Sequence, residues 1–262
     1  MSLVRIEQDG AVVRVVLCRV AMHNALVPEL LADLLAALAR LKDDGDCRAV
    51  VLAAEGPAFS IGGDMRRFRR EGECGDLRAY GEKLVGQLNE AILALIDLPQ
   101  PVVAAVHGIV TGGSIGLVVA ADIVFVAPQA VFKAHYVTAG FGPDGGWTAL
   151  VSRLAGRRRA AAALLLNRSI RAEEAVAWGL ANEIVAADGL LEEASKAARK
   201  MAGYPQGTLR AAKRLLWGDR GQLAADLEAE RARFVELIVG PAARAGVDAF
   251  LRNFGSYPDA TE

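Results

Sequence analysis

The sequence has few cysteines and no excess of charge of either sign. Its 262 residues include three cysteines, Cys18, Cys47 and Cys74, which lie far apart in the chain. An odd number of isolated cysteines indicates neither a disulfide framework nor a metal site, and is typical of a reducing compartment. The formal net charge is −1, from 30 basic and 31 acidic residues, so the overall charge favours neither nucleic acid nor an acidic membrane as a partner.

The N-terminus also lacks the basic stretch and long apolar run of a signal peptide. One uncharged stretch, residues 102–121, is about as long as a membrane span. Gly108, Gly112 and Gly116 interrupt it, and the Thr-Gly-Gly-Ser at its centre is a turn signal. We therefore expect a strand, a tight loop and a buried helix there. With 53% hydrophobic residues the chain can bury a large core, and we predict a soluble cytoplasmic protein without a membrane span.

Apolar periodicity changes along the chain. Before about residue 145, β-rich runs alternate with amphipathic helical patterns, which favours parallel β-α units after a first hairpin at Asp9-Gly10. The expected strands are 3–6, 12–18, 49–53, 102–106, 123–126 and 131–133, and the expected helices are 27–41 and 77–96. After residue 145 the pattern is almost wholly helical, at 147–154, 158–166, 172–178, 190–201, 207–217, 221–239 and 242–253. Such short amphipathic helices need a surface to cover them, either the α/β core or another subunit.

Two glycine-bearing turns follow predicted strands. The first comprises Phe59-Ser60-Ile61-Gly62-Gly63-Asp64, and the second comprises residues 107–114 and precedes a helix. Glycine allows backbone N–H groups to approach a ligand, and the free amides of a helix N-terminus favour negative charge. Two such amides converging on one oxygen would form an oxyanion hole, although tight packing explains such turns equally well. Neither turn has a phosphate-loop pattern.

A series of short motifs resembles the successive motifs of the enoyl-CoA hydratase/isomerase (crotonase) family. They are Asn24-Ala25-Leu26, Phe59 to Asp64, Ala105-Val106-His107-Gly108 with Gly112-Gly113, Ala121-Asp122, Gly142-Pro143-Asp144-Gly145-Gly146, residues 167–175 and Trp178-Gly179-Leu180. They follow the family's order and spacing from about residue 3 to residue 253. The resemblance implies an α/β fold in which a crotonase-like spiral of β-β-α units spans residues 1–200. It further implies that a helical region, residues 201–262, covers the CoA site and assembles a homotrimer or hexamer.

The same resemblance implies an enzyme that acts on an acyl-CoA thioester. Backbone amides of Ile61 and Gly113 would form an oxyanion hole for the thioester carbonyl and stabilise an enolate. The residues that would contact the substrate are Ala25, Ser60, Ile61, Gly62, Gly63, Asp64, Gly112, Gly113 and Tyr136. Because coenzyme A is part of the substrate, we expect no separate cofactor and no metal.

The hydratases of this family use two glutamates, and this sequence has neither. One would activate water while the other delivers the α-proton. Gly116 stands at the first position, and Tyr136 corresponds to the second. Since glycine cannot transfer a proton, we do not expect ordinary two-glutamate hydration.

One acid, Asp144, remains in a suitable motif. It matches the aspartate of branches that resemble ring-epoxyphenylacetyl-CoA isomerase and certain enoyl-CoA isomerases, and it lies close to the nucleophile position of chlorobenzoyl-CoA dehalogenase. An isomerase needs only one carboxylate, which removes a proton and returns it at another carbon. Asp144 is equally a candidate N-cap for a helix beginning at Trp147, so both interpretations stay open.

Several functions therefore remain. We favour an isomerase that uses Asp144; the alternatives are an atypical hydratase, a non-catalytic acyl-CoA-binding protein, and hydrolysis or dehalogenation with Asp144 as the nucleophile. His135 and Tyr136 lie either in an acyl pocket or in the core. The arginines at positions 66, 67, 69 and 70 either bind CoA phosphates or form a solvated helix face.

Overall fold

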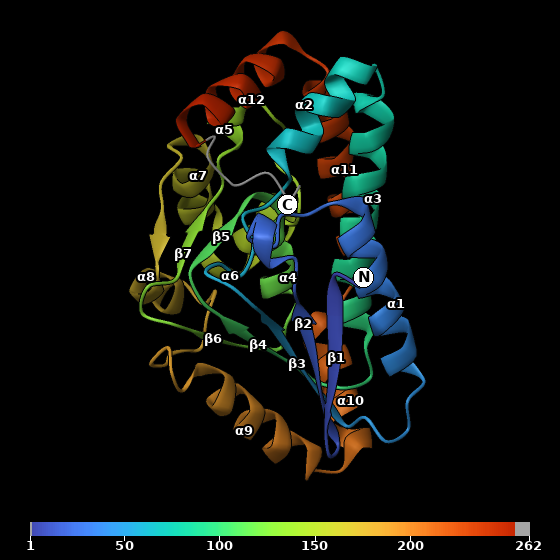
Figure 1. The fold of residues 1–262 in the computed structure, drawn as a ribbon. Coiled ribbons are helices and arrows are strands. Elements are labelled where there is room, and N and C mark those ends of the chain that lie inside the picture. Colours follow the sequence, from blue (N-terminus) through green and yellow to red (C-terminus); the bar gives the residue numbers. More distant parts are fainter. Residues whose placement is uncertain (1, 255–262) are drawn as a thin grey trace.

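The computed structural model describes residues 2–254 of the chain (Figure 1). Residue 1 of the predicted core region 1–200 and residues 255–262 of the predicted C-terminal region 201–262 lie outside the described residues.

A six-stranded sheet forms the centre of the molecule. In spatial order its strands are β1 (Val4–Asp9), β2 (Val12–Leu17), β3 (Ala49–Ala54), β4 (Val102–Val106), β6 (Ile123–Val126) and β9 (Glu183–Ile184). β1 and β2 form the antiparallel hairpin expected from the sequence, and all other neighbours in this sheet are parallel. The prediction of parallel β-α units is confirmed.

Helices cover both faces of this sheet (Figure 1). Val50 and Leu52 of β3 belong to a core shared with α1 (Pro28–Lys42) and α3 (Leu77–Asp97). Ala49, Val51 and Ala53 of β3 point the other way and pack with α9 (Leu190–Ala202). A parallel strand buried on both sides needs an unbroken apolar run, which explains the composition of β3 and β4.

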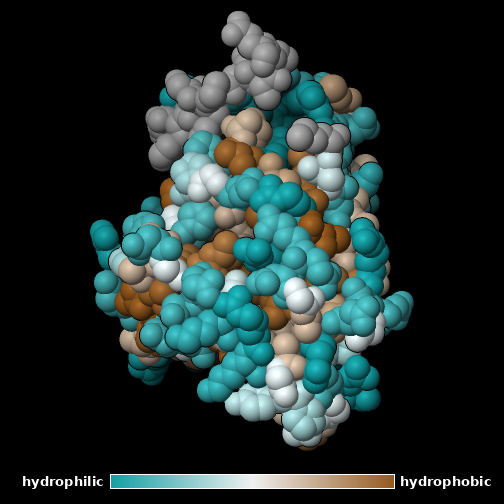
Figure 2. Space-filling view, turned by 60° about the horizontal axis from the view of Figure 1, so that its bottom comes forward, coloured by the Kyte–Doolittle hydropathy of each residue, from teal (hydrophilic) through white to brown (hydrophobic). Residues whose placement is uncertain are grey.

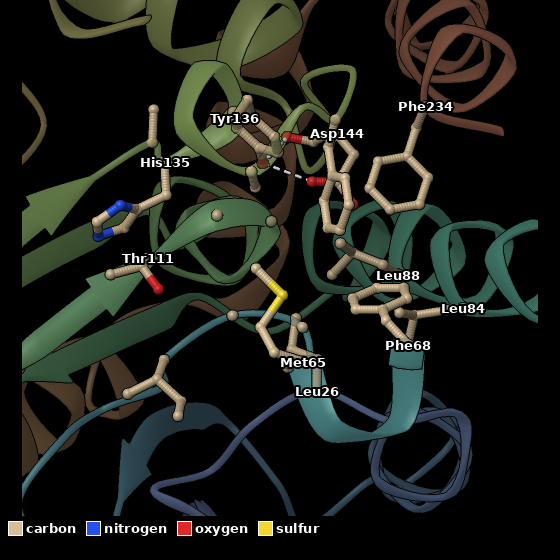
Figure 3. Close-up of a pocket in the computed structure, with 18 of the residues that line it drawn as sticks. Leu26, Met65, Phe68, Leu84, Leu88, Thr111, His135, Tyr136, Asp144 and Phe234 are labelled. Atoms are coloured by element: carbon tan, nitrogen blue, oxygen red, sulfur yellow. Dashed lines mark hydrogen bonds between the residues drawn. The ribbon is translucent and has the colours of Figure 1, made fainter. Parts of the chain in front are cut away.

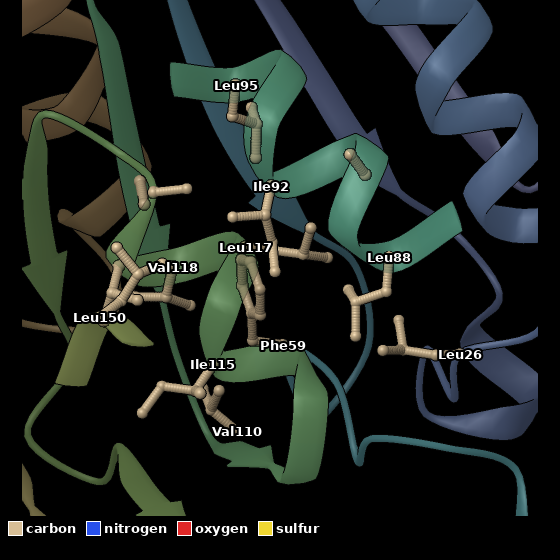
Figure 4. Close-up of a cluster of buried hydrophobic side chains, with 14 of the residues drawn as sticks. Leu26, Phe59, Leu88, Ile92, Leu95, Val110, Ile115, Leu117, Val118 and Leu150 are labelled. Atoms are coloured by element: carbon tan, nitrogen blue, oxygen red, sulfur yellow. The ribbon is translucent and has the colours of Figure 1, made fainter. Parts of the chain in front are cut away.

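A smaller sheet carries the second glycine turn. It consists of β5 (Ile109–Thr111), β7 (Val131–Lys133) and β8 (Ile170–Arg171). β5 leads into a 3-10 turn, Gly112–Ser114, and then into the short buried helix α4 (Ile115–Val119). α4 packs against α3, and Leu117 of α4 belongs to the same buried core as Leu88 and Ile92 of α3 (Figure 4), so the turn rests on an apolar core.

The last two helices, α11 and α12, pack on the first half of the chain. α11 (Arg220–Ile238) packs along α3, and α12 (Pro241–Phe254) packs against α2 (Met65–Cys74) and α5 (Tyr136–Ala139). Leu227 and Phe234 of α11 belong to the same buried core as α1 and α3. The other helical segments are Val20–Met22, η3 (Trp147–Val151), α6 (Ser152–Ala155), α7 (Arg157–Leu165), α8 (Ala172–Ala177) and α10 (Gln206–Trp217).

Two parts of the sequence interpretation need correction. Helix α2 was not predicted, because its arginine- and glutamate-rich sequence buries one side chain, Phe68, and shows no apolar period. The prediction of an almost wholly helical second half is also wrong in detail. β8 pairs with β7 and β9 pairs with β6, but each has two residues, which is too short for an alternating pattern.

The uncharged stretch 102–121 contains the expected strand, tight turn and short buried helix, and also a second strand, β5, where the sequence predicted part of the loop. Within residues 2–254, no helix is long and apolar enough to cross a bilayer. The same residues contain no group of three or more His, Cys, Asp or Glu side chains that could hold a metal ion. One face of the molecule is mostly hydrophilic, with hydrophobic side chains between (Figure 2).

Candidate active site

The two glycine turns lie against each other. A parallel bridge joins Ser60 to β5, so the first turn runs beside the strand that leads into the second. Gly62 has a φ of +76°, and a Cβ there would lie 2.6 Å from the Thr111 carbonyl oxygen, so glycine is needed. Trp147 fastens the second turn by donating its indole N–H to the Gly112 carbonyl at 2.8 Å.

Main-chain N–H groups of Gly63 and Gly113 have no hydrogen-bond acceptor within residues 2–254. Leu26 pairs with the first turn through the Gly62 carbonyl and the Asp64 N–H. Because N–H groups alternate in direction along an extended chain, the Gly63 N–H points away from Leu26. Gly63 is therefore the free amide of the first turn, and Gly113 provides a free amide in the second.

Ile61 differs from what its sequence motif suggested. The Ile61 N–H, which the sequence analysis assigned to the oxyanion hole, already donates to the His23 carbonyl at 3.2 Å. Gly63, two residues later, therefore presents the available amide of the first turn. Sequence spacing alone does not distinguish these positions, because both belong to the same glycine motif.

Asp144 lies beside the second turn. A Cβ built on Gly113 would fall 2.9 Å and 3.1 Å from the two carboxylate oxygens of Asp144, so the carboxylate rests against the Gly113 Cα. The Asp144 side chain is 6% exposed, and the Tyr136 hydroxyl donates to its Oδ1 at 2.5 Å, as Figure 3 shows. A thioester oxygen bound at the Gly113 amide would therefore place neighbouring carbon atoms near this carboxylate.

The surroundings of Asp144 bring its titration close to neutrality. Burial raises the pKa of Asp144 to about 7, the Tyr136 hydrogen bond opposes this rise, and the negative charge of Glu230 adds to it. Burial, together with the negative charge of Asp144, raises the pKa of Tyr136 well above its usual value, so Tyr136 acts as a hydrogen-bond donor. A carboxyl group that titrates near neutral pH suits proton transfer.

Asp144 does not cap the helix that follows it. η3 begins after Gly146, and no side chain at that N-cap accepts a hydrogen bond. Glu230 of α11 takes this place instead: its carboxylate accepts from the N–H groups of Gly146, Thr148 and Ala149 at 2.7, 2.6 and 3.0 Å. The capping interpretation of Asp144 is therefore wrong. Sequence analysis missed Glu230 because it lies 84 positions from Gly146.

Gly63, Gly113 and Asp144 line an apolar pocket of about 50 Å³, here called the reaction pocket. Figure 3 shows Asp144 among its lining side chains. Its hydrophobic wall comprises Leu26, Met65, Phe68, Leu84, Leu88, Ala134, Ala139, Phe141, Phe234 and Phe250. His135 and Tyr136 also line it, so they face the pocket rather than only the core. Burial, and then the charge of Lys133, lower the pKa of His135 to about 4, so its ring is neutral at physiological pH.

Most predicted site residues meet at this pocket. Those that line it are Ile61, Gly62, Gly63, Gly112, Gly113, Tyr136 and Asp144. Ala25 and Ser60 are buried behind the turn, where the Ser60 hydroxyl donates to the Asn24 carbonyl at 2.7 Å. Asp64 caps α2 and pairs with Arg19 at 2.8 Å. Ala25, Ser60 and Asp64 thus support the turn rather than line the reaction pocket.

The basic run after the first turn borders a separate cleft of about 340 Å³. Its polar lining is Arg19, Glu29, Asp64, Arg66, Arg67 and Arg70. Arg67 is committed to Glu71 at 2.5 Å, and Arg69 pairs with Glu73 at 3.0 Å. The run therefore combines helix-face ion pairs with arginines that border a cleft close to the reaction pocket.

Gly116 is enclosed at the position where the sequence resemblance placed a hydratase glutamate. A Cβ at Gly116 would lie 2.4 Å from both the Gly145 carbonyl oxygen and Ile92 Cδ1. The loop that carries Asp144 therefore packs directly on Gly116. A glutamate cannot enter there without moving this loop.

Comparison with known proteins supports this description of fold and site. The family model of enoyl-CoA hydratase/isomerase matches residues 7–254, so the chain belongs to this family and is an enzyme of it. A crystal structure of an enoyl-CoA hydratase/isomerase from Mycobacterium paratuberculosis is 29% identical, with a TM-score of 0.87 over 95% of this chain and 98% of that one. The predicted crotonase-type α/β fold is thereby confirmed.

Relatives with different named activities match comparably well. The 1,2-epoxyphenylacetyl-CoA isomerase of Escherichia coli (strain K12) is 30% identical over 256 residues, 96% of each chain. A 4-chlorobenzoyl coenzyme A dehalogenase of Arthrobacter sp is 29% identical over 202 residues, 77% of this chain and 73% of the relative. Membership of the family therefore does not determine the particular reaction, which must be inferred from the residues of the site.

Proposed function

We propose that this protein is an acyl-CoA isomerase that moves a proton with a single carboxylate, Asp144. The thioester carbonyl oxygen accepts hydrogen bonds from the Gly63 and Gly113 amides. Asp144 removes a proton from a carbon next to the carbonyl, and the electron pair passes to the oxygen as an enolate. The enolate then collapses and takes a proton from Asp144 at another carbon, which shifts the double bond without net gain or loss of atoms.

One observation carries this proposal: the buried Asp144 carboxylate, which caps no helix, rests against Gly113 and lines an apolar pocket. The pKa of Asp144, raised to about 7 by burial, is suited to both accepting and returning a proton. The amides supply the electrostatic stabilisation, since preorganised donors at a developing oxyanion contribute several kcal/mol, about 3 to 4 each. Gly63 replaces Ile61 in this proposal because the Ile61 amide is occupied.

The cleft bordered by Arg19, Arg66 and Arg70 is the proposed site for the phosphates of coenzyme A. Guanidinium groups bind phosphate strongly, and the cleft adjoins the turn that holds the thioester. The homotrimer or hexamer, the covering of the CoA site by residues 201–262 and the cytoplasmic location remain predictions. Measurement of the particle mass in solution tests the oligomeric state, and cell fractionation tests the location.

Isotope exchange tests the proposed reaction directly. The protein is incubated in deuterated water with 2-enoyl, 3-enoyl, aromatic and epoxy-aromatic CoA thioesters, and the products are analysed by mass spectrometry. We expect a double-bond shift or deuterium uptake that is lost in Asp144→Asn. Full turnover by Asp144→Asn on the best substrate would remove Asp144 from the mechanism.

The same measurement separates the alternatives. Similarity to a dehalogenase favours Asp144 as a nucleophile, which would leave an acyl adduct on the protein that mass spectrometry detects. Addition of water to crotonyl-CoA at ordinary enzymatic rates would favour an atypical hydratase, although Gly116 has no room for the usual glutamate. Binding without any mass change would favour a non-catalytic acyl-CoA-binding protein.

A further inference from the structure

Helix α5 is a single turn that cannot hold its own position. It spans Tyr136–Ala139 and lies between two residues in the left-handed region, His135 with a φ of +64° and Gly140 with a φ of +71°. So short a helix is not stable alone, because nucleation of the first turn is unfavourable. The orientation of α5 therefore depends on the groups that pack on its two ends.

Helix α12 packs on the C-terminal end of α5 through two glycines. A Cβ at Gly246 of α12 would lie 2.2 Å from the Ala139 carbonyl oxygen. A Cβ at Gly140 would lie 2.5 Å from the carbonyl carbon and the carbonyl oxygen of Ala242, in α12. Both distances are too short for non-bonded atoms, so the two backbones touch only because both residues are glycine.

The chain that leads from α5 to Asp144 also packs on α11. A Cβ at Gly142 would lie 2.8 Å from the backbone nitrogen of Phe234 in α11. Gly142 is two residues before Asp144, and Gly146, whose N–H donates to Glu230, is two residues after it. Contacts with α11 and α12 therefore hold this segment on both sides of Asp144.

Asn167 holds the other end of α5. Its side-chain Oδ1 accepts a hydrogen bond from the His135 N–H at 3.0 Å. Asn167 lies between α7 and β8, and its own φ is +50°, in the left-handed region that asparagine tolerates better than most residues. The two ends of α5 are thus fixed separately, one by α12 and the other by the Asn167 side chain.

Between these ends, α5 carries the side-chain donor to the proposed base. The Tyr136 hydroxyl donates to Asp144 Oδ1 at 2.5 Å. The titratable groups that act on the Asp144 carboxyl are Tyr136 of α5 and Glu230 of α11, and His135 also lines the reaction pocket. The side chain that α12 adds to the pocket lining is the apolar Phe250. Helix α12 therefore acts on Asp144 through the backbone that it holds.

We propose that both ends of α5 position the proposed base, with Gly140, Gly246 and Asn167 as the positioning residues. Their contacts set the place of α5, and α5 sets the distance from the Tyr136 hydroxyl to the Asp144 carboxylate. The inference rests on the proposed function where Asp144 is called a base. The hydrogen bond between Tyr136 and Asp144 does not depend on turnover, so it can be measured separately.

Gly246→Ala tests the α12 end. Its methyl group pushes α5 and α12 apart, which withdraws the Tyr136 hydroxyl from Asp144. We expect the pKa of Asp144, followed by NMR of isotope-labelled aspartate carboxyl groups, to rise by less than about one unit, as in Tyr136→Phe. Gly207→Ala is the matched control in helix α10, where a Cβ would have open space around it, and it should leave the pKa of Asp144 unchanged.

A double variant separates positioning from general destabilisation. If Gly246→Ala acts through Tyr136, its addition to Tyr136→Phe should cause no further rise in the pKa of Asp144, since the hydroxyl is already absent. The acidic limb of the kcat/KM profile should show the same lack of additivity. An unchanged pKa in Gly246→Ala, or a rise that adds fully to that of Tyr136→Phe, would overturn the inference.

Asn167→Gly tests the other end, and it decides the question if Gly246→Ala does not fold. Glycine adopts a positive φ without strain, so this substitution removes the acceptor of the His135 N–H and keeps the backbone conformation. We expect a rise in the pKa of Asp144 that is again not additive with Tyr136→Phe. An unchanged pKa would contradict the dependence of Tyr136 on the ends of α5.

Failure of the inference and failure of the proposed function give different results. If the pKa of Asp144 rises as expected but Asp144→Asn exchanges protons like the wild type, the positioning holds and the isomerase mechanism fails. If Asp144→Asn abolishes exchange while Gly246→Ala and Asn167→Gly leave the pKa of Asp144 unchanged, the base holds and the inference fails.

Discussion

Two buried carboxylates, in the Asp144 loop and in helix α11, differ in how their charge is balanced. Asp144 and Glu230 are 6% and 4% exposed. Glu230 accepts three backbone N–H groups and the Thr148 hydroxyl, which donates at 2.6 Å. The side-chain donor to Asp144 is the Tyr136 hydroxyl. Because burial favours the neutral acid and donors favour the anion, the number of donors distinguishes Glu230, which holds a loop, from Asp144, the proposed base.

The two carboxylates also depend on each other. Glu230 holds the segment that begins at Gly146, two residues beyond Asp144, so it fixes the loop on which Asp144 sits. Its negative charge contributes to the raised pKa of Asp144. A helix from the end of the chain thereby sets both the position and the proton affinity of the proposed base.

The largest expected effect is on turnover. Asp144→Asn should lower proton exchange by about 10³-fold, since general acid–base groups typically contribute 10²- to 10⁴-fold. Glu230→Gln should retain exchange within about tenfold, since it removes a charge but leaves the base in place. Exchange rates in deuterated water check both. Similar losses of exchange in the two variants would contradict the assignment of Asp144 as the base and of Glu230 as a residue that only holds the loop.

Glu230→Ala should be the most destabilising of these substitutions. It leaves three amides and a hydroxyl without their acceptor, and we expect a loss of about 3 kcal/mol in the free energy of unfolding. Glu228→Ala is the matched control on the same helix. Glu228 is exposed and pairs with Arg231, so we expect a loss below about 1 kcal/mol. Urea denaturation compares them, and equal losses would contradict a structural function for Glu230.

Gly116→Ala tests the packing beneath the Asp144 loop. Its Cβ would press on the Gly145 carbonyl and on Ile92, and we expect a loss of about 2 kcal/mol. Gly86→Ala is a control within α3, where a Cβ would meet only Arg231 Cδ, at 4.0 Å. That variant should gain up to about 1 kcal/mol from the lower entropy of its unfolded chain. A Gly116→Ala protein as stable as the wild type would show that the loop yields easily.

Asp144→Asn should also change how stability depends on pH. In the wild type the unfolded state loses the Asp144 proton near 3.8, whereas the folded state keeps it up to about 7. Stability from this group is therefore full below pH 4 and is lost as the pH rises to about 7. Relative to the wild type, Asp144→Asn should be more stable at pH 8 than at pH 4, by up to about 4 kcal/mol. A pH-independent difference in urea denaturation would argue against a raised pKa.

Tyr136→Phe should produce the smallest change. The Tyr136 hydrogen bond lowers the pKa of Asp144, so its removal should move the acidic limb of the kcat/KM profile to higher pH, by less than about one unit. Above that limb the activity should stay within about tenfold of the wild type. A shift to lower pH would mean that Tyr136 does not stabilise the carboxylate.

Sequence alone was sufficient for the family, for the strands of the first half other than β5 and for the two glycine turns. These features depend on local patterns: apolar periods in β3 and β4, the hairpin at Asp9-Gly10 and the ordered motifs. Asp144, Tyr136 and Gly113 were predicted as site residues, and all three line the reaction pocket. Helix α2 lacked an apolar period, and β8 and β9 were too short to show one.

Tertiary structure decided which backbone amides and which carboxylate in those motifs are available to bind a ligand. The direction of each N–H depends on pairing with distant residues. Only the fold therefore shows that the Ile61 N–H donates to the His23 carbonyl and that the Gly63 N–H is free. The local sequence made Asp144 a plausible cap, and only the return of α11 places Glu230 there instead. Burial and hydrogen bonding across long separations are properties of the packed chain, and they turn an ordinary aspartate into the proposed base.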